Sequence, residues 1–108
     1  MEPPHHRTFP FAARAEVIPE NVGAMVLAQV KELSLHGCYL EFANQLEKGM
    51  HVVVKIFAGS DFFEANANVI YSQPILGTCL VFRDLKRHFA RVLQRWLLQA
   101  MKGSESSD

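Results

Sequence analysis

The chain has 108 residues, of which 49% are hydrophobic and 20% are charged, so it has the composition of one folded domain and not of a disordered chain. Eleven Lys and Arg balance eleven Asp and Glu. This zero net charge excludes a strong overall attraction to nucleic acid or to an acidic membrane. No apolar run approaches the roughly 20 residues of a membrane span, and the opening MEPPHHR lacks the apolar core of a signal peptide. We therefore expect a soluble, cytoplasmic protein.

The two cysteines, Cys38 and Cys79, are too few for a disulfide framework. They fall at apolar positions of expected strands, where a thiol is typical of the core. Neither the cysteines nor the five histidines show the spacing of a metal site. No Ser/His/Asp order or convergent set of carboxylates indicates catalysis. We expect no enzyme, no metal and no cofactor.

Six short segments show the alternation of apolar and polar residues that is typical of half-buried strands. They span 12–18, 25–31, 38–42, 51–58, 62–71 and 75–82, with turn residues between them. Their regular spacing predicts a β-barrel or a β-sandwich. We expect residues 1–11 to form an N-terminal arm. At the hairpin tip near residue 60, we expect one of Phe62 and Phe63 to face solvent and to mark a contact patch.

The pattern changes to a helical period from Asp84 to Met101. Asp84 is a suitable N-cap, and Gly103 suits the position just past the last turn. Residues 103–108 are then expected to be a disordered tail. The apolar stripe should close one end of the barrel, with Phe89 and Trp96 in the contact. Its members are Leu85, Phe89, Val92, Leu93, Trp96, Leu97 and Ala100.

The opposite face of this helix is basic. Residues 83–102 hold six Lys and Arg against one acidic residue, a net charge of +5 that leaves −5 on the rest of the chain. Arg87, Arg91 and Arg95 recur every four residues and form a stripe. A solvated face is the simpler interpretation. The alternative is a surface that binds an acidic protein partner.

The segment ELSLHG, residues 32–37, lies in a turn between two expected strands. A Ser34 hydroxyl can bond a nearby backbone amide, and Gly37 can supply a positive φ. Turns of this kind are ordinary, so the surrounding sequence has to decide whether this one binds a ligand.

That surrounding sequence resembles the PilZ domain family, the bacterial receptor module for cyclic di-GMP (c-di-GMP). The stretches that carry the resemblance are VKELSLHGCYLEF, LEKGMHVVVKI and NVIYSQPILGTCLVFRDL. The resemblance covers about residues 7–100. It implies a six-stranded antiparallel β-barrel with one C-terminal amphipathic helix, occupying residues 12–102.

The family has a (D/N)xSxxG turn, and the resemblance implies ligand contacts from Glu32, Ser34 and Gly37. Glu32 replaces the family's Asp or Asn and keeps a carboxylate that could accept from a guanine edge, one methylene further out.

The family's arm carries RxxxR, and here Arg7 is its one remaining arginine. The missing partner is Phe11 if Arg7 is the first arginine, or Pro3 if it is the second. Each lost charge-assisted contact costs about 1.5–3 kcal/mol, or roughly ten- to a hundred-fold in affinity. We therefore predict binding in the micromolar range or weaker.

The resemblance implies a single-domain signalling adaptor that relays to a separate protein in motility, pilus or biofilm control. The alternative is a degenerate PilZ domain that binds no nucleotide and acts only through protein contacts. A third class, a small barrel that holds RNA or DNA with its basic helix, is disfavoured by the zero net charge and by the absence of a basic, aromatic strand face.

Overall fold

The computed structural model describes residues 7–21, 23–41, 43, 46–75 and 77–105. It contains six strands followed by one helix. They are β1 (Phe9–Pro19), β2 (Val26–Leu33), β3 (Gly37–Glu41), β4 (His51–Ala58), β5 (Asp61–Gln73), β6 (Gly77–Asp84) and α1 (Arg87–Glu105).

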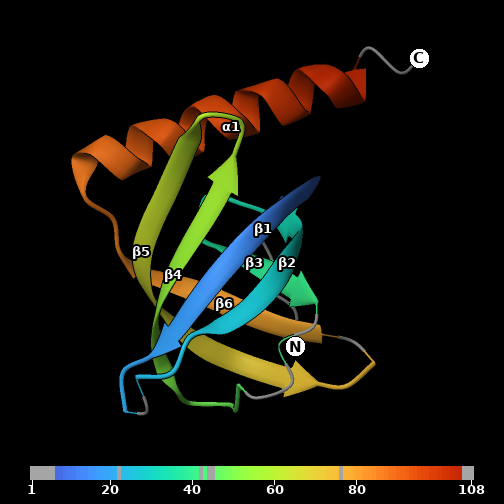
Figure 1. Cartoon of the computed structure of the whole chain (residues 1–108). Coiled ribbons are helices and arrows are strands. Elements are labelled where there is room, and N and C mark those ends of the chain that lie inside the picture. The colour runs from blue at the N-terminus through green and yellow to red at the C-terminus, as the bar shows by residue number, and fades with distance from the viewer. Residues whose placement is uncertain (1–6, 22, 42, 44–45, 76, 106–108) are drawn as a thin grey trace.

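The strands form a closed barrel in the order β1-β2-β3-β6-β5-β4, with antiparallel pairing throughout (Figure 1). Strands β1 to β3 make one meander, and strands β4 to β6 make a second. Two long-range pairings, β1 with β4 and β3 with β6, join the meanders into the barrel. The prediction of a six-stranded antiparallel barrel with a C-terminal helix is confirmed.

The core lies inside the barrel, as the alternating pattern predicts. In β4, Val52, Val54 and Ile56 are fully buried, whereas the side chains of Val53 and Lys55 between them are partly exposed. Facing strands supply the other walls, for example Ala15 and Val17 of β1. The period of two therefore identifies the inward face of each strand correctly.

The ends of α1 differ from the sequence-based expectation. Asp84 is not the N-cap, because it pairs with Asn66 as the last residue of β6, and the helix begins at Arg87. The first helical bond runs from Ala90 N–H to the Lys86 carbonyl, at 2.9 Å. Gly103 does not end the helix, which continues to Glu105. Residues 106–108 of the expected tail lie outside the described residues.

The start of the barrel also differs. Strand β1 begins at Phe9, so residues 9–11 belong to the sheet and not to the arm. The reason is pairing with the end of β2, where Phe9 lies opposite Leu33 and Pro10 opposite Glu32. Residues 1–6 of the expected arm lie outside the described residues.

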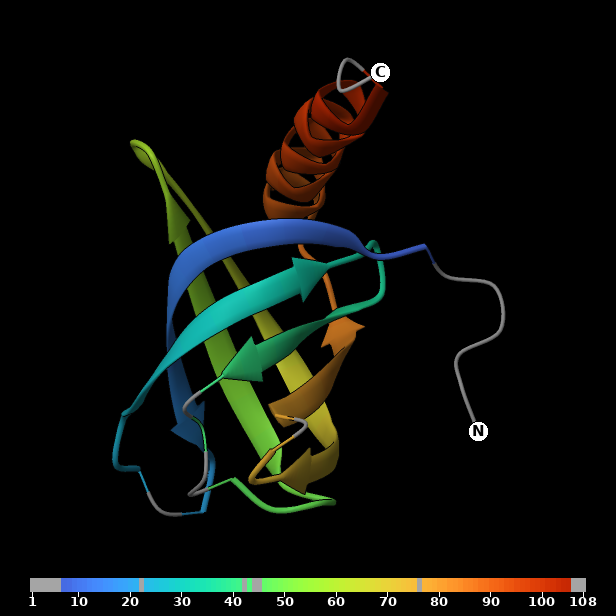
Figure 2. The ribbon, with the colours of Figure 1, turned by 90° about the vertical axis from the view of Figure 1, so that its right-hand side faces the viewer.

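Helix α1 lies across one end of the barrel, above β1 and beside the tip of the β4–β5 hairpin (Figure 2). The Trp96 ring stacks on Phe11 of β1, with centroids 5.3 Å apart, and lies 6.4 Å from Phe63 of β5. Phe89 meets Phe63 edge-on at 6.2 Å. These contacts confirm that Phe89 and Trp96 lie in the helix–barrel contact. Leu85 precedes the helix, is 36% exposed and is not part of the core cluster, so it does not belong to the buried stripe.

Candidate functional site

The beginning of β1 is fastened to the end of β2. Thr8 Oγ1 donates a hydrogen bond of 2.8 Å to Glu32 Oε1, next to the Pro10–Glu32 pair of the ladder. This bond holds the preceding residue, Arg7, beside the β2–β3 turn. Two of the residues that the sequence singled out, Arg7 and Glu32, are thus brought to the same edge of the barrel.

The β2–β3 turn is closed by Ser34. Its buried Oγ accepts from the backbone N–H groups of His36 and Gly37, at 3.1 Å each. The Ser34 N–H donates to the Gly37 carbonyl at 2.9 Å. The backbone interpretation of Ser34 is therefore confirmed, and its hydroxyl organises the turn from within.

Gly37 is needed for a different reason from the one expected. It is not among the glycines with positive φ in the described part of the chain, so that expectation is wrong. Instead, β6 passes so close that a Cβ at residue 37 would collide with the Leu80 carbonyl oxygen and would lie 3.2 Å from the Val81 Cα. The absent side chain permits the β3–β6 pairing, in which Gly37 lies opposite Val81.

The other arginine of the family motif would stand at residue 11 if Arg7 is the first, and at residue 3 if Arg7 is the second. Phe11 is a half-buried residue of β1 that stacks on Trp96, so it is part of the packing beneath α1. Pro3 lies outside the described residues. Arg7 itself is exposed, with its guanidinium 4.9 Å above the Phe9 ring. A core role for residue 11 favours the register in which Arg7 is the second arginine.

We expect Phe11→Arg to destabilise the fold by about 2 kcal/mol, because it removes an aromatic contact and places a guanidinium beneath the helix. Pro3→Arg should strengthen the c-di-GMP binding that the family resemblance implies by roughly ten- to a hundred-fold. Thermal melts and calorimetry on both variants measure these effects. A stable Phe11→Arg variant that binds c-di-GMP more tightly would show that the other register is correct.

A polar aromatic cluster that the sequence analysis missed lies near Glu32. Tyr39 of β3 and Tyr71 of β5 have ring centroids 6.3 Å apart, and Cys79 of β6 pairs with both in the ladders. Burial, followed by the neighbouring Cys79, raises the pKa of Tyr39 to about 12, and burial also raises the pKa of Tyr71. Both phenols remain neutral at physiological pH and can donate hydrogen bonds. The cluster depends on the long-range β3–β6 pairing, which local sequence patterns do not reveal.

Cys38 and Cys79 are free and buried, which confirms the prediction of core thiols. Burial raises the pKa of both thiols, so they stay protonated at neutral pH and are poor nucleophiles. Within the described ranges, no group of three or more His, Cys, Asp and Glu side chains lies where it could hold a metal ion.

One of the three arginines of the basic stripe on α1 forms an ion pair with the barrel. Arg95 donates to Asp61 at the β4–β5 tip, with a distance of 2.8 Å. Arg87 and Arg91 are exposed and have no carboxylate within 4 Å among the residues that the structure covers. At the same tip Phe63 is fully buried and Phe62 is largely exposed, as predicted for one member of that pair.

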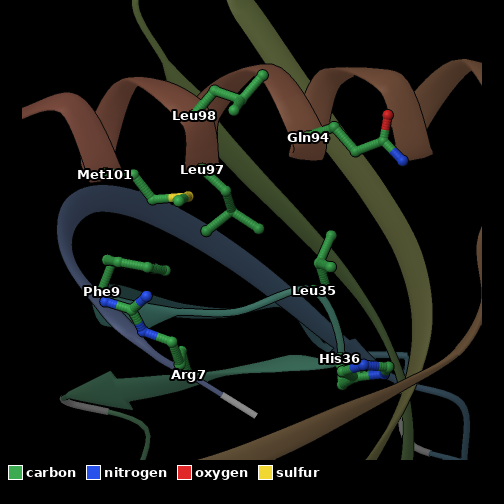
Figure 3. Close-up of a pocket in the computed structure, with 8 residues that line it drawn as sticks. All are labelled: Arg7, Phe9, Leu35, His36, Gln94, Leu97, Leu98 and Met101. Carbon is green, nitrogen blue, oxygen red and sulfur yellow. The ribbon is translucent and has the colours of Figure 1, made fainter.

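A pocket of about 490 Å³ lies between the start of β1, the β2–β3 turn and α1 (Figure 3). Its lining residues are Arg7, Phe9, Leu35, His36, Gln94, Leu97, Leu98 and Met101. Of these, only Arg7 was selected from the sequence as a site residue. The sequence predicts Leu97 in the buried stripe and selects none of the other three helix residues, because a helical period does not show which neighbouring turn the helix covers.

The site thus lies on a closed six-stranded barrel with a helix packed over one end. In it, Arg7 lies just before β1 and beside the S-x-x-G turn of residues 34–37. The family model of the PilZ domain matches residues 4–99, and the chain therefore belongs to the PilZ domain family. In the described residues no helix is long and apolar enough to span a membrane.

Solved structures with the same fold support this assignment. The PilZ domain of YcgR from Escherichia coli, solved with c-di-GMP, has a TM-score of 0.72 at 13% identity and covers 98% of this chain and 97% of its own. The PilZ domain of CeSA from a cellulose-synthesizing bacterium has a TM-score of 0.66 at 13% identity, covering 82% and 92%. The Bacillus subtilis inhibitor of motility MotI/DgrA has a TM-score of 0.68 at 12% identity, with 94% of this chain and 53% of that chain covered. No curated protein matches the chain.

Proposed function

We propose that this PilZ domain is a non-enzymatic, cytoplasmic signalling adaptor that binds c-di-GMP weakly and relays its presence to a separate protein. The observation that carries this proposal is the Thr8–Glu32 hydrogen bond, which places Arg7 beside the β2–β3 turn. The PilZ domain of YcgR was solved with c-di-GMP, and MotI is an inhibitor of motility. The description of MotI supports motility as the controlled process, and control of pili or biofilm is the alternative within this proposal.

The roles of the residues follow from their chemistry. The Arg7 guanidinium would hold a phosphate or the O6/N7 edge of a guanine through two parallel hydrogen bonds. Glu32 Oε1 already accepts from Thr8, while Oε2 has no hydrogen-bond partner among the described residues and would accept from guanine N–H groups. Ser34 and Gly37 would act indirectly, by fixing the turn against β6.

The proposed affinity is low for two reasons. The arm supplies one guanidinium where the family motif has two, and each charge-assisted contact to a ligand is worth about 1.5–3 kcal/mol. The hydroxyl of Ser34 is engaged inside the turn. Calorimetry with c-di-GMP should therefore give a dissociation constant in the micromolar range or weaker.

Replacing Arg7 should remove most of this binding. We expect Arg7→Ala to weaken c-di-GMP binding by at least about tenfold, and added salt to weaken the wild type in the same direction. Arg14→Ala is the matched control, because Arg14 is an exposed arginine of β1 that pairs with Glu16 at 3.2 Å. Nanomolar binding by the wild type, or equal effects of the two substitutions, would contradict the proposed site.

A second candidate function is a domain that binds no nucleotide and acts only through protein contacts. The specific observation in its favour is the pocket beside Arg7, whose lining is mostly apolar: Phe9, Leu35, Leu97, Leu98 and Met101. Such a lining suits protein side chains better than phosphates. The absence of heat and of chemical-shift changes with millimolar c-di-GMP would exclude nucleotide binding and favour this alternative.

A further inference from the structure

The pocket between β1, the β2–β3 turn and α1 is an apolar groove with exposed rims. Phe9 and Leu97 form its buried floor, and in Figure 3 Leu97 and Met101 point from the helix toward Phe9 and Leu35. Leu35 on one rim is 49% exposed, and Leu98 on the other is 55% exposed. Large apolar side chains that gather around one cavity are typical of a binding surface, whereas scattered ones are not.

The groove follows two turns of α1. Gln94, Leu97, Leu98 and Met101 have the i, i+3, i+4, i+7 spacing that keeps side chains on one helix face. Seven residues of helix span about 10 Å. The volume of about 490 Å³ lies in the range of pockets that hold ligands, about 300–1,000 Å³.

The border of the groove is positively charged. Arg7 lines the groove, and among the described residues that line the groove there is no Asp or Glu. On α1, Arg91 and Lys102 lie within about 40° of Leu98 around the helix axis, at 100° per residue. Both are exposed. Arg91 has no carboxylate within 4 Å among the described side chains, whereas Arg95 is paired with Asp61 at 2.8 Å. An occupant with carboxylates beside its apolar residues would complement this border.

We propose that the groove binds an acidic amphipathic helix of a partner protein, a proposal that rests on the protein-relay part of the proposed function. A helix satisfies its own backbone hydrogen bonds, so it can enter an apolar groove without leaving N–H and C=O groups unpaired. Apolar residues at i, i+3 or i+4, and i+7 match two turns of α1. Glutamates beside them face Arg7 on one side and Arg91 and Lys102 on the other.

The probe is a fluorescein-labelled synthetic helical peptide with Leu at i, i+4 and i+7, Glu beside these positions and Ala elsewhere. Two matched peptides replace the Leu residues by Ser or the Glu residues by Lys. Fluorescence anisotropy should show saturable binding of the first peptide to the wild-type protein and at least about tenfold weaker binding of the other two. The affinity should fall with added salt, because the charged border is exposed.

Leu98→Gln removes one rim of the groove and keeps a good helix former. It should weaken peptide binding by about three- to tenfold, since a half-exposed leucine loses part of its possible burial. Leu27→Gln is the matched control, because Leu27 of β2 is also exposed, at 61%, and does not line the groove. Circular dichroism melts of both variants should match the wild type and show that the fold is intact.

Several results would overturn the proposal. One is the absence of saturable binding by the acidic peptide, and another is equal binding by the Leu98→Gln and Leu27→Gln variants. A third is that c-di-GMP, and not the peptide, shifts the NMR resonances of Leu98 and Met101, which would make the groove a nucleotide pocket. Calorimetry with c-di-GMP on Leu98→Gln keeps the two proposals separate, because loss of peptide binding with unchanged nucleotide binding affects only the groove.

Discussion

Trp96→Ala is expected to destabilise the protein by about 3–5 kcal/mol, the usual cost of removing a buried aromatic side chain. Trp96 is 4% exposed, stacks on Phe11 and lies against Phe63, so its loss opens a cavity between α1 and the barrel. For a domain of this size each kcal/mol lowers the melting temperature by about 4–8 °C. Thermal melts should therefore show a decrease of roughly 12 °C or more.

The matched control is Leu98→Ala in the same helix. Leu98 is largely exposed, and the substitution keeps helix propensity, so the melting temperature should change by only a few degrees. A Trp96→Ala variant that melts like the control would show that α1 does not pack on the barrel as described. The comparison separates loss of packing from any general effect on the helix.

Gly37→Ala is expected to cost about 3 kcal/mol, at the upper end of the range for overpacking. The added Cβ meets the carbonyl of Leu80, and backbone of a central strand cannot move away without breaking the β3–β6 ladder. The same change should disturb the turn that Ser34 closes, because Gly37 provides one of its N–H donors. Chemical denaturation measures the loss of stability, and calorimetry measures the accompanying loss of the proposed c-di-GMP binding.

Gly59→Ala distinguishes close approach from backbone strain. Gly59 has a φ of +61°, and a Cβ there would meet no atom within 4 Å. Its replacement should cost only the strain of a left-handed residue, about 1–2 kcal/mol, and should leave the proposed c-di-GMP binding unchanged. Equal stability of the Gly37→Ala and Gly59→Ala variants would mean that β6 does not approach Gly37 closely.

Most of the barrel could be predicted from local patterns. Segment 51–58 has the same bounds in the structure, and 62–71 differs from β5 by only one or two residues at each end. The helix begins three residues later than expected, because ladder pairing with Asn66 keeps Asp84 extended. Alternation identifies which side of a strand is buried, but a strand's partners are not encoded in its own pattern. The choice of a barrel over a sandwich therefore followed only from the resemblance to a family, and the two pairings that close the barrel, β1 with β4 and β3 with β6, are seen only in the structure.

Of the candidate site, too, the residues within short motifs could be predicted, whereas features that depend on long-range contacts could not. Arg7, Glu32, Ser34 and Gly37 could be selected because they lie in two short motifs. The role of Gly37 was predicted wrongly, since its crowding comes from Leu80, more than forty residues later in the chain. The groove was missed for a similar reason. It exists only where the turn and the start of β1 meet residues 94–101, and these segments become neighbours after the helix has packed.

The groove lies between parts of the chain that belong to different meanders, so a ligand bound there stabilises the fold. Phe9 and Leu35 belong to the first meander and its turn, and Arg7 lies just before it, whereas Leu97 and Leu98 belong to the helix that follows the second meander. A ligand in the groove contacts both of these parts of the chain. When the protein unfolds, the two parts separate and the binding site is lost. Because the ligand binds only the folded state, it raises the free energy of unfolding by about 2.7 kcal/mol at a ligand concentration of a hundred times its dissociation constant. If the proposed partner helix binds there, the lifetime of the protein in the cell should rise with the bound fraction, because proteases degrade the unbound, more readily unfolded molecules first.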